Sequence, residues 1–181
     1  MAPVSESILK RYDGAHDDSR FRAAWSYWNR ICGDRAFPRR ADFDPVEIPD
    51  LLAITELVDV LDSGRDFRFR LIGTEIDALS QGYYTHRRLS EIPETSPPGG
   101  RAQDFRACLD TGAPVLIARA CPGQHNGEAR TLKLLLLPLS ETGREISLLW
   151  GLVLREFSDG RLGIKCSPRP TRRKEAMLNL A

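Results

Sequence analysis

The sequence lacks the features that mark membrane-spanning and secreted proteins. No apolar run approaches the roughly 20 residues that a helix needs to cross a bilayer, and the longest, LLLLPL after Lys133, contains a proline. The first residues, MAPVSESILK, do not have the basic and then apolar build of a secretory signal. We therefore expect a cytoplasmic protein without a membrane span.

A strong net charge is lacking too, because 26 Lys and Arg residues nearly balance 25 Asp and Glu residues. The formal net charge of +1 gives no global field that would attract nucleic acid or an anionic membrane, so any such binding has to be local. A basic cluster lies in the tail at 166–181 and consists of Arg169, Arg172, Arg173 and Lys174. We expect a flexible tail that is either solvated or able to contact phosphates or an acidic protein surface.

Motifs for metal binding and catalysis are missing as well. The four cysteines show no Cys-x-x-Cys pair and no His at ligand spacing, so we expect reduced cysteines that act as small apolar residues, and no metal site. There is no Gly-x-Ser-x-Gly, phosphate-binding Gly-rich loop or His-Glu-x-x-His. His16, His86 and His125 lie in polar stretches, which disfavours a buried general base. We expect no enzymatic activity and name no catalytic residue.

What is present is organised around the stretch 67–82, FRFRLIGTEIDALSQG. Phe67, Phe69 and Leu71 alternate with Arg68 and Arg70, a pattern typical of a half-buried strand. The glycine and threonine that follow end the strand, and the acidic residue three positions later favours the start of a helix. The stretch therefore predicts a strand that leads directly into a short helix.

Between residues 18 and 33, apolar residues recur every three or four positions, and Gly33 follows as a stop signal. The pattern predicts an amphipathic helix with an aromatic face. This face has two possible partners, the domain's own sheet or a second copy of the chain. For the second alternative, Phe21, Trp25 and Trp28 are the interface candidates, because aromatic residues dominate interface energetics.

The remaining periodicities complete an α+β domain. Strands are predicted at 54–61 and 67–72, then a helix that Gly112 ends, then strands at 115–121, 131–139 and 146–157. We expect a five-stranded antiparallel sheet with short helices on one face, in addition to the N-terminal helix. The predicted division is a flexible arm at 1–17, one domain at 18–165 whose sheet and helical middle span 54–157, and the tail at 166–181.

Several motifs along the chain resemble one family. The shared pattern is a Trp, a basic turn with Gly, Pro-x-Arg-x-Asp-Phe-Asp-Pro and Arg-Leu-x-Gly-Thr. The matching residues are Trp28, Gly33, Pro38, Arg40, Asp42, Phe43, Asp44, Pro45, Arg70, Leu71, Gly73 and Thr74. In these residues, and over about residues 20 to 155, the chain resembles stand-alone bacterial PAS-type sensory domains. It departs from them at Thr85 and His86, where the family usually has Thr-Gly. The resemblance implies a PAS-like fold, a sensory role and no catalytic residues.

In a fold of this kind, the concave face of the sheet and the helical middle enclose a space that either holds a small ligand or is filled by side chains. Candidate ligand-binding residues come from one alternating set on the central strands and from the loop after the short helix. They are Phe69, Leu71, Leu134, Trp150, Tyr84 and His86. A haem on His86 is not favoured, because a solitary loop histidine is more often exposed. A flavin photoreceptor requires Asn-Cys-Arg-Phe, which is absent. The sequence therefore requires no cofactor.

Arg119 interrupts the apolar run VLIARAC and is costly to bury unpaired. If it points inward, it is the best candidate to hold a carboxylate or phosphate, because a guanidinium offers a planar fork of donors. If it points outward, it is a solvated strand residue.

Taken together, these features predict a sensory or regulatory module without an output domain of its own. It would act through a signalling partner or as a homodimer, with or without a small ligand. The first alternative is a small-molecule binding domain with Arg119 as the anion anchor. The second is binding of nucleic acid or of an acidic partner through the basic tail.

Overall fold

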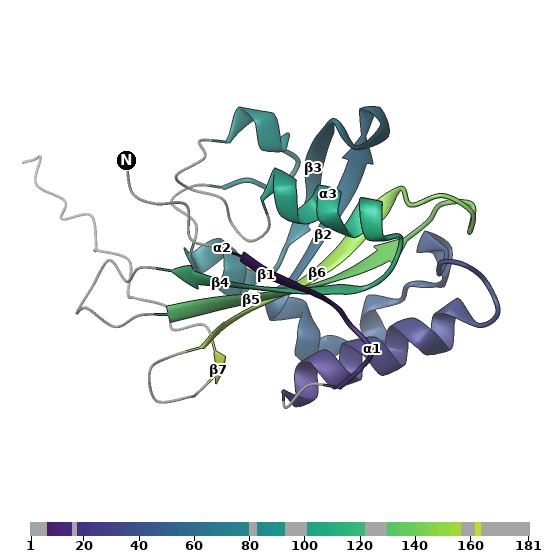
Figure 1. Cartoon of the computed structure of the whole chain (residues 1–181), viewed down its shortest axis with the longest axis horizontal. Helices are drawn as coiled ribbons and strands as arrows, with labels where there is room; N and C mark the ends of the chain where they lie inside the picture. Colours follow the sequence, from purple (N-terminus) through teal and green to yellow (C-terminus); the bar gives the residue numbers. More distant parts are fainter. Residues whose placement is uncertain are drawn as a thin grey trace, which may run out of the picture.

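The computed structural model describes residues 7–15, 18–79, 83–92, 101–121, 130–156 and 162–163. Within them the chain forms one antiparallel sheet with the strand order β1-β4-β5-β6-β2-β3, and β7 pairs with β6 (Figure 1). The strands are β1 (Ser7–Arg11), β2 (Thr55–Leu61), β3 (Asp66–Ile72), β4 (Val115–Cys121), β5 (Arg130–Leu139), β6 (Leu148–Glu156) and β7 (Leu162–Gly163).

In the described part of the chain, three α-helices and five short 3₁₀ turns accompany the sheet. The α-helices are α1 (Ser19–Cys32), α2 (Thr74–Leu79) and α3 (Ala102–Thr111). The 3₁₀ turns are η1 (Arg40–Asp42), η2 (Pro45–Glu47), η3 (Pro49–Ile54), η4 (Asp62–Gly64) and η5 (Leu89–Glu91). The predicted α+β fold is confirmed, and the five predicted strands agree with β2 to β6 within two residues at each end.

The sheet is wider than predicted, and part of the arm predicted to be flexible belongs to it. Residues 7–11 form strand β1, which pairs with β4 so that Leu9 lies opposite Ile117. Ile8 is 61% exposed and Leu9 is 44% exposed, so the strand has no buried stripe that an alternation pattern would reveal. Its structure comes from the free edge of β4, which supplies the backbone hydrogen-bonding partners.

Both faces of the sheet are covered: the short helices α2 and α3 share one face, as predicted, and the N-terminal helix α1 covers the other. On the first side, α1 and η3 pack against Leu135, Leu137 and Trp150; we call this the α1 face. On the second side, α2 and α3 pack against Phe69 and Leu134; we call this the α3 face. Figure 1 shows α1 and α3 on opposite sides of the strands. The central strands β5 and β6 therefore bury both sets of alternating side chains.

The ends of the helices follow the predicted signals. The Asp18 carboxylate accepts a hydrogen bond from Arg20 N at 2.9 Å at the start of α1, and Gly33 follows the last turn. Gly112 adopts the left-handed conformation after α3, with φ of 59° and ψ of 26°.

The two cysteines with described side chains, Cys32 and Cys108, are free and buried. Burial raises the pKa of both thiols, that of Cys108 to about 12, so neither is a nucleophile at neutral pH. The prediction of small apolar cysteines is confirmed for this pair. The side chains of Cys121 and Cys166 lie outside the described residues.

Gly73 makes the junction between β3 and α2. Its N–H donates to Thr55 O at 2.7 Å, which draws the chain against the end of η3. A Cβ atom on this residue would lie 2.3 Å from Leu52 O and 2.5 Å from Ala53 O, both of them backbone atoms. Only glycine fits there, because rigid backbone cannot move aside as a flexible side chain can.

We predict that Gly73→Ala lowers the free energy of unfolding by about 3 kcal/mol through overpacking. The matched control is Gly112→Ala, which adds a Cβ atom in open space and costs only the strain of a left-handed alanine, about 1 kcal/mol. Urea denaturation of both variants measures the difference. Equal losses would show that the close contact at Gly73 is relieved by a backbone shift.

Candidate functional site

Aromatic side chains fill the space between α3 and the sheet. Phe105 of α3 lies with its ring centroid 5.0 Å from that of Phe67 and 6.1 Å from that of Phe69, and all three are fully buried. Ile76 from α2 and Leu134 from β5 are also fully buried on this face. Of the two alternatives for the interior, this part of the molecule corresponds to the packed one.

A charged pair crosses the same interior. Arg119 of β4 points inward and forms an ion pair with Asp104 of α3, and each residue is only 3% exposed. The Asp104 carboxylate also accepts a hydrogen bond from Arg101 N at 2.8 Å, so it caps the first turn of α3. One carboxylate thus joins the N-terminal end of α3 to strand β4.

The inward alternative for Arg119 is therefore the one observed, and its partner is a carboxylate of the chain itself. Asp104 is not recognisable from the sequence as the partner of Arg119. Its position three residues after Arg101 is a capping signal, but nothing in the sequence indicates that it pairs with Arg119 fifteen residues away.

The structure does not bring all the predicted ligand-binding residues together. Phe69, Tyr84 and Leu134 share the α3 face with Arg119, whereas Trp150 lies on the α1 face, where its indole N–H donates to Thr55 Oγ1 at 3.1 Å. Leu71 and His86 are exposed. Leu71 and Trp150 are therefore corrections to the predicted inward set, whereas His86 lies in the loop after α2, where the sequence placed it.

Two physical reasons account for the corrections. In β6 every residue from 148 to 154 is buried, so alternation alone does not tell one face from the other. Between β2 and β3 the pairing moves from Leu57 opposite Leu71 to Val58 opposite Phe69, which leaves Arg70 as an extra residue. This β-bulge breaks the alternation, so Phe69 and Leu71 do not point to the same side.

The aromatic face of α1 packs on the chain's own sheet. Phe21 and Trp28 are buried, and the Trp28 indole N–H donates to Pro138 O at 2.8 Å. Of the three interface candidates, only Trp25 is half-buried. It stacks on Trp28 at 5.7 Å and meets the edge of Tyr12 at 5.6 Å. Trp25 thus holds the segment that connects β1 to α1.

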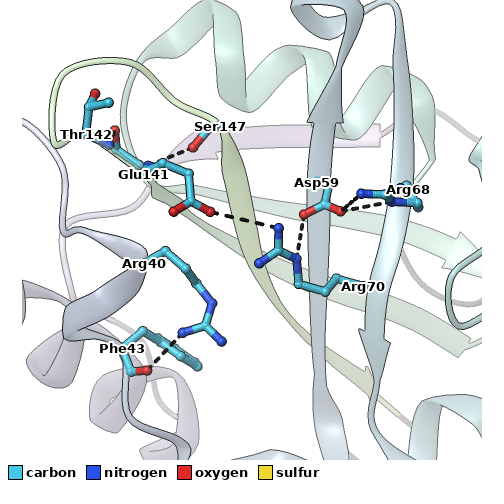
Figure 2. Close-up of polar contacts among 9 residues, drawn as sticks. Arg40, Phe43, Asp59, Arg68, Arg70, Glu141, Thr142 and Ser147 are labelled. Atoms are coloured by element: carbon cyan, nitrogen blue, oxygen red, sulfur yellow. Dashed lines mark hydrogen bonds and ion pairs between the residues drawn. The ribbon is translucent and has the colours of Figure 1, made fainter.

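A polar network lies on the other side of β3 from the aromatic interior (Figure 2). Asp59 of β2 has a side chain that is only 7% exposed. Its carboxylate accepts from Arg68 Nε at 3.0 Å and Nη2 at 2.8 Å, and from Arg70 Nε at 2.7 Å. Arg70 Nη2 in turn lies 3.9 Å from Glu141 Oε1 in the loop between β5 and β6. One nearly buried carboxylate thus fixes two arginine side chains of the edge strand.

The motif residues between 38 and 45 join their segment to the sheet. Arg40 N donates to Ser140 O at 2.7 Å, and Ser140 N donates to Pro38 O at 2.9 Å. The Phe43 ring packs on Trp150 with its centroid at 4.9 Å, and the Asp44 carboxylate caps η2 by accepting from Val46 N at 2.9 Å. Most of this motif therefore has a structural role.

Comparison with known proteins identifies the class. The family model for the PAS domain matches residues 17–154, which is most of the chain. The chain therefore belongs to the PAS domain family, a family of sensory and regulatory modules, as the motifs predicted.

No curated protein matches the sequence. A solved structure described as an RNA-binding light-oxygen-voltage receptor is similar at 12% identity with a TM-score of 0.46. The match covers 85% of this chain and 39% of the receptor chain.

Two further observations concern the described residues alone. None of their helices is long and apolar enough to cross a membrane. They contain no group of three or more His, Cys, Asp or Glu side chains placed to hold a metal ion. The basic tail at 166–181 lies outside them.

We predict that Trp25→Ala loosens the segment at 7–15 while α1 stays folded. Loss of the aromatic contacts, about 1.4 kcal/mol, should raise the initial rate of tryptic cleavage after Lys10 and Arg11 roughly 10-fold. Mass spectrometry of the fragments gives the rate, and Tyr83→Ala, which removes an exposed aromatic ring, is the control. An unchanged rate in Trp25→Ala would mean that β4 alone holds β1.

We also predict that Asp104→Asn lowers the free energy of unfolding by about 3 kcal/mol, because it removes the countercharge of a buried cation. Asparagine can still accept from Arg101 N, so the cap is kept. Glu47→Gln is the control, since it breaks the exposed ion pair with Arg30 and should cost less than about 1 kcal/mol. In guanidinium denaturation, the double variant Asp104→Leu, Arg119→Met should recover most of the lost free energy of unfolding. Losses in the double variant that equal the sum of the two single losses would contradict a coupled pair.

Proposed function

We propose that this PAS domain is a cytoplasmic regulatory module that acts through self-association. The observation that supports this is the edge strand β1. No described strand pairs with its outer edge, and Ile8 and Leu9 expose apolar side chains there. An open edge of this kind is a template for pairing with another chain.

A second copy of the chain is a suitable occupant of this edge. Antiparallel pairing centred on Leu9 sets Leu9 against its own copy, Ile8 against Lys10, and Ser7 against Arg11. No like charges then lie directly opposite each other, which is the arrangement that destabilises cross-strand pairs. The other edge strand, β3, is partly occupied, because Phe69 N donates to Arg87 O at 3.1 Å and His86 N donates to Phe69 O.

The same strand has a short route to the interior. Ser7 of β1 lies opposite Arg119 of β4, and Arg119 pairs with Asp104 at the start of α3. A change in the position of α3 would therefore also shift β4 and the neighbouring strand β1. In this proposal the regulated equilibrium lies between two positions of α3, and pairing at β1 favours one of them.

Oxidative cross-linking tests the proposed pairing. In a Cys121→Ser, Cys166→Ser background, Leu9→Cys should give a disulfide-linked dimer, because directly opposed residues bring their Cβ atoms close together. Val46→Cys is the matched control, since Val46 is exposed but lies in η2, away from the edge. Sedimentation of the unmodified chain should show a concentration-dependent dimer.

Two results would contradict self-association at β1. One is a Leu9→Cys variant that dimerises no more than Val46→Cys does, and the other is a chain that sediments as a monomer at every concentration. The regulatory role would then depend on contact with a different signalling protein.

A second candidate function is binding of a small anionic ligand in the interior, with Arg119 as the anchor. The buried guanidinium on the α3 face favours it, although the Asp104 carboxylate already occupies one side of that fork. Native mass spectrometry of freshly purified protein should then show a ligand that Arg119→Met loses. A mass equal to the bare chain would contradict this candidate.

A further inference from the structure

Three elements that are distant in the sequence bring charged side chains to one place on the surface. They are η1 with Arg40, β3 with Arg70, and the loop between β5 and β6 with Glu141. Figure 2 shows Arg40 and Arg70 extending toward the same space, with Glu141 on its third side. The hydrogen bond from Arg40 N to Ser140 O, which precedes Glu141, fixes the first and third elements to each other.

Each arginine is held by one part of its guanidinium. Arg40 Nη1 donates to Phe43 O at 3.2 Å, and the group lies over the Phe43 ring at 5.7 Å. Its Nε atom is buried and has no acceptor among the described residues. Arg70 gives its Nε to Asp59, and its side chain is 39% exposed. The two anchors orient both groups and leave donors directed into the shared space.

The countercharge in this space is incomplete. In the network of Figure 2, the guanidiniums of Arg40, Arg68 and Arg70 face the carboxylates of Asp59 and Glu141. Both oxygens of the Asp59 carboxylate accept hydrogen bonds from Arg68 or Arg70. Glu141 is 55% exposed, and its 3.9 Å contact with Arg70 is longer than a hydrogen bond. Glu141 is therefore a carboxylate of the chain itself that is only weakly bound to the two arginines.

The loop that carries Glu141 is well ordered by its own hydrogen bonds. Glu141 N donates to Ser147 Oγ at 2.8 Å, and Gly143 N donates to Ser140 Oγ at 2.8 Å. The backbone on this side of the space is thus fixed, and only the Glu141 side chain has to turn away for another anion to enter.

From this geometry we propose that Arg40 and Arg70 form a binding site for the oxyanion of a small ligand, a carboxylate or phosphate group. The ligand oxygens would accept hydrogen bonds from both guanidinium groups and displace the Glu141 carboxylate. Charge-assisted hydrogen bonds to a fork of donors are the strongest that such groups make. The site lies on the side of β3 opposite the aromatic interior and is independent of pairing at β1.

Titration of the full chain with inorganic phosphate, and separately with acetate, tests the site at constant ionic strength. The side-chain Nε–H resonances of Arg40 and Arg70 report binding. Arg40→Gln and Arg70→Gln should each weaken it roughly 10-fold, the effect of one lost charge-assisted hydrogen bond. Shifts with phosphate alone would assign a phosphate group, and shifts with acetate alone a carboxylate.

The variant Glu141→Gln distinguishes a specific anion-binding site from a general attraction of anions to basic residues. It removes the competing carboxylate without touching either arginine, so binding should tighten at least about 3-fold. Arg87→Gln is the matched control, because Arg87 is a half-exposed arginine 4.0 Å from a glutamate elsewhere on the surface. The proposal is overturned if Glu141→Gln leaves affinity unchanged, if neither anion shifts these resonances, or if Arg87→Gln weakens binding as much as Arg70→Gln.

Discussion

Burial of both faces of the central strands is the constraint on which the rest of the structure depends. Residues 148–154 of β6 are all buried, and β5 beside it is almost continuously apolar. Burial at about 25 cal/mol per Å² makes such strands the main source of stability, but only if a layer covers each side. The helix α1 provides one layer and α3 provides the other.

This constraint also explains what the sequence could predict. Element type and order follow from local periodicity and turn residues, so β2 to β6 and α1 lie close to their predicted bounds, and α3 ends before Gly112 as predicted. In a strand that is buried on both sides, periodicity does not show which way a side chain points, so the sequence groups Trp150 with Phe69 and Leu134 although Trp150 lies on the α1 face. Strand β1 was missed for the complementary reason, since its apolar residues are exposed.

The candidate site was only partly predictable, because its geometry depends on how α3 docks on the sheet and on a β-bulge in β3. Arg119 was recognisable as a charge within an apolar run, but Asp104 belongs to a helix whose docking no local pattern describes. The bulge at Arg70 is likewise a property of strand pairing. It is this extra residue that separates Phe69 from Leu71. The motif pointed to Arg40 and Arg70 without indicating that they converge.

The two charged assemblies differ in how they respond to their surroundings. The pair of Asp104 and Arg119 is nearly free of solvent, so salt screens it little, and its loss would disturb the packing of α3. Arg70 and Glu141 are half-exposed, so their contact contributes little to stability and weakens with salt. A group that contributes little to stability can change partners at little cost. The buried pair is therefore suited to holding a conformation, and the surface arginines are suited to exchanging one anion for another.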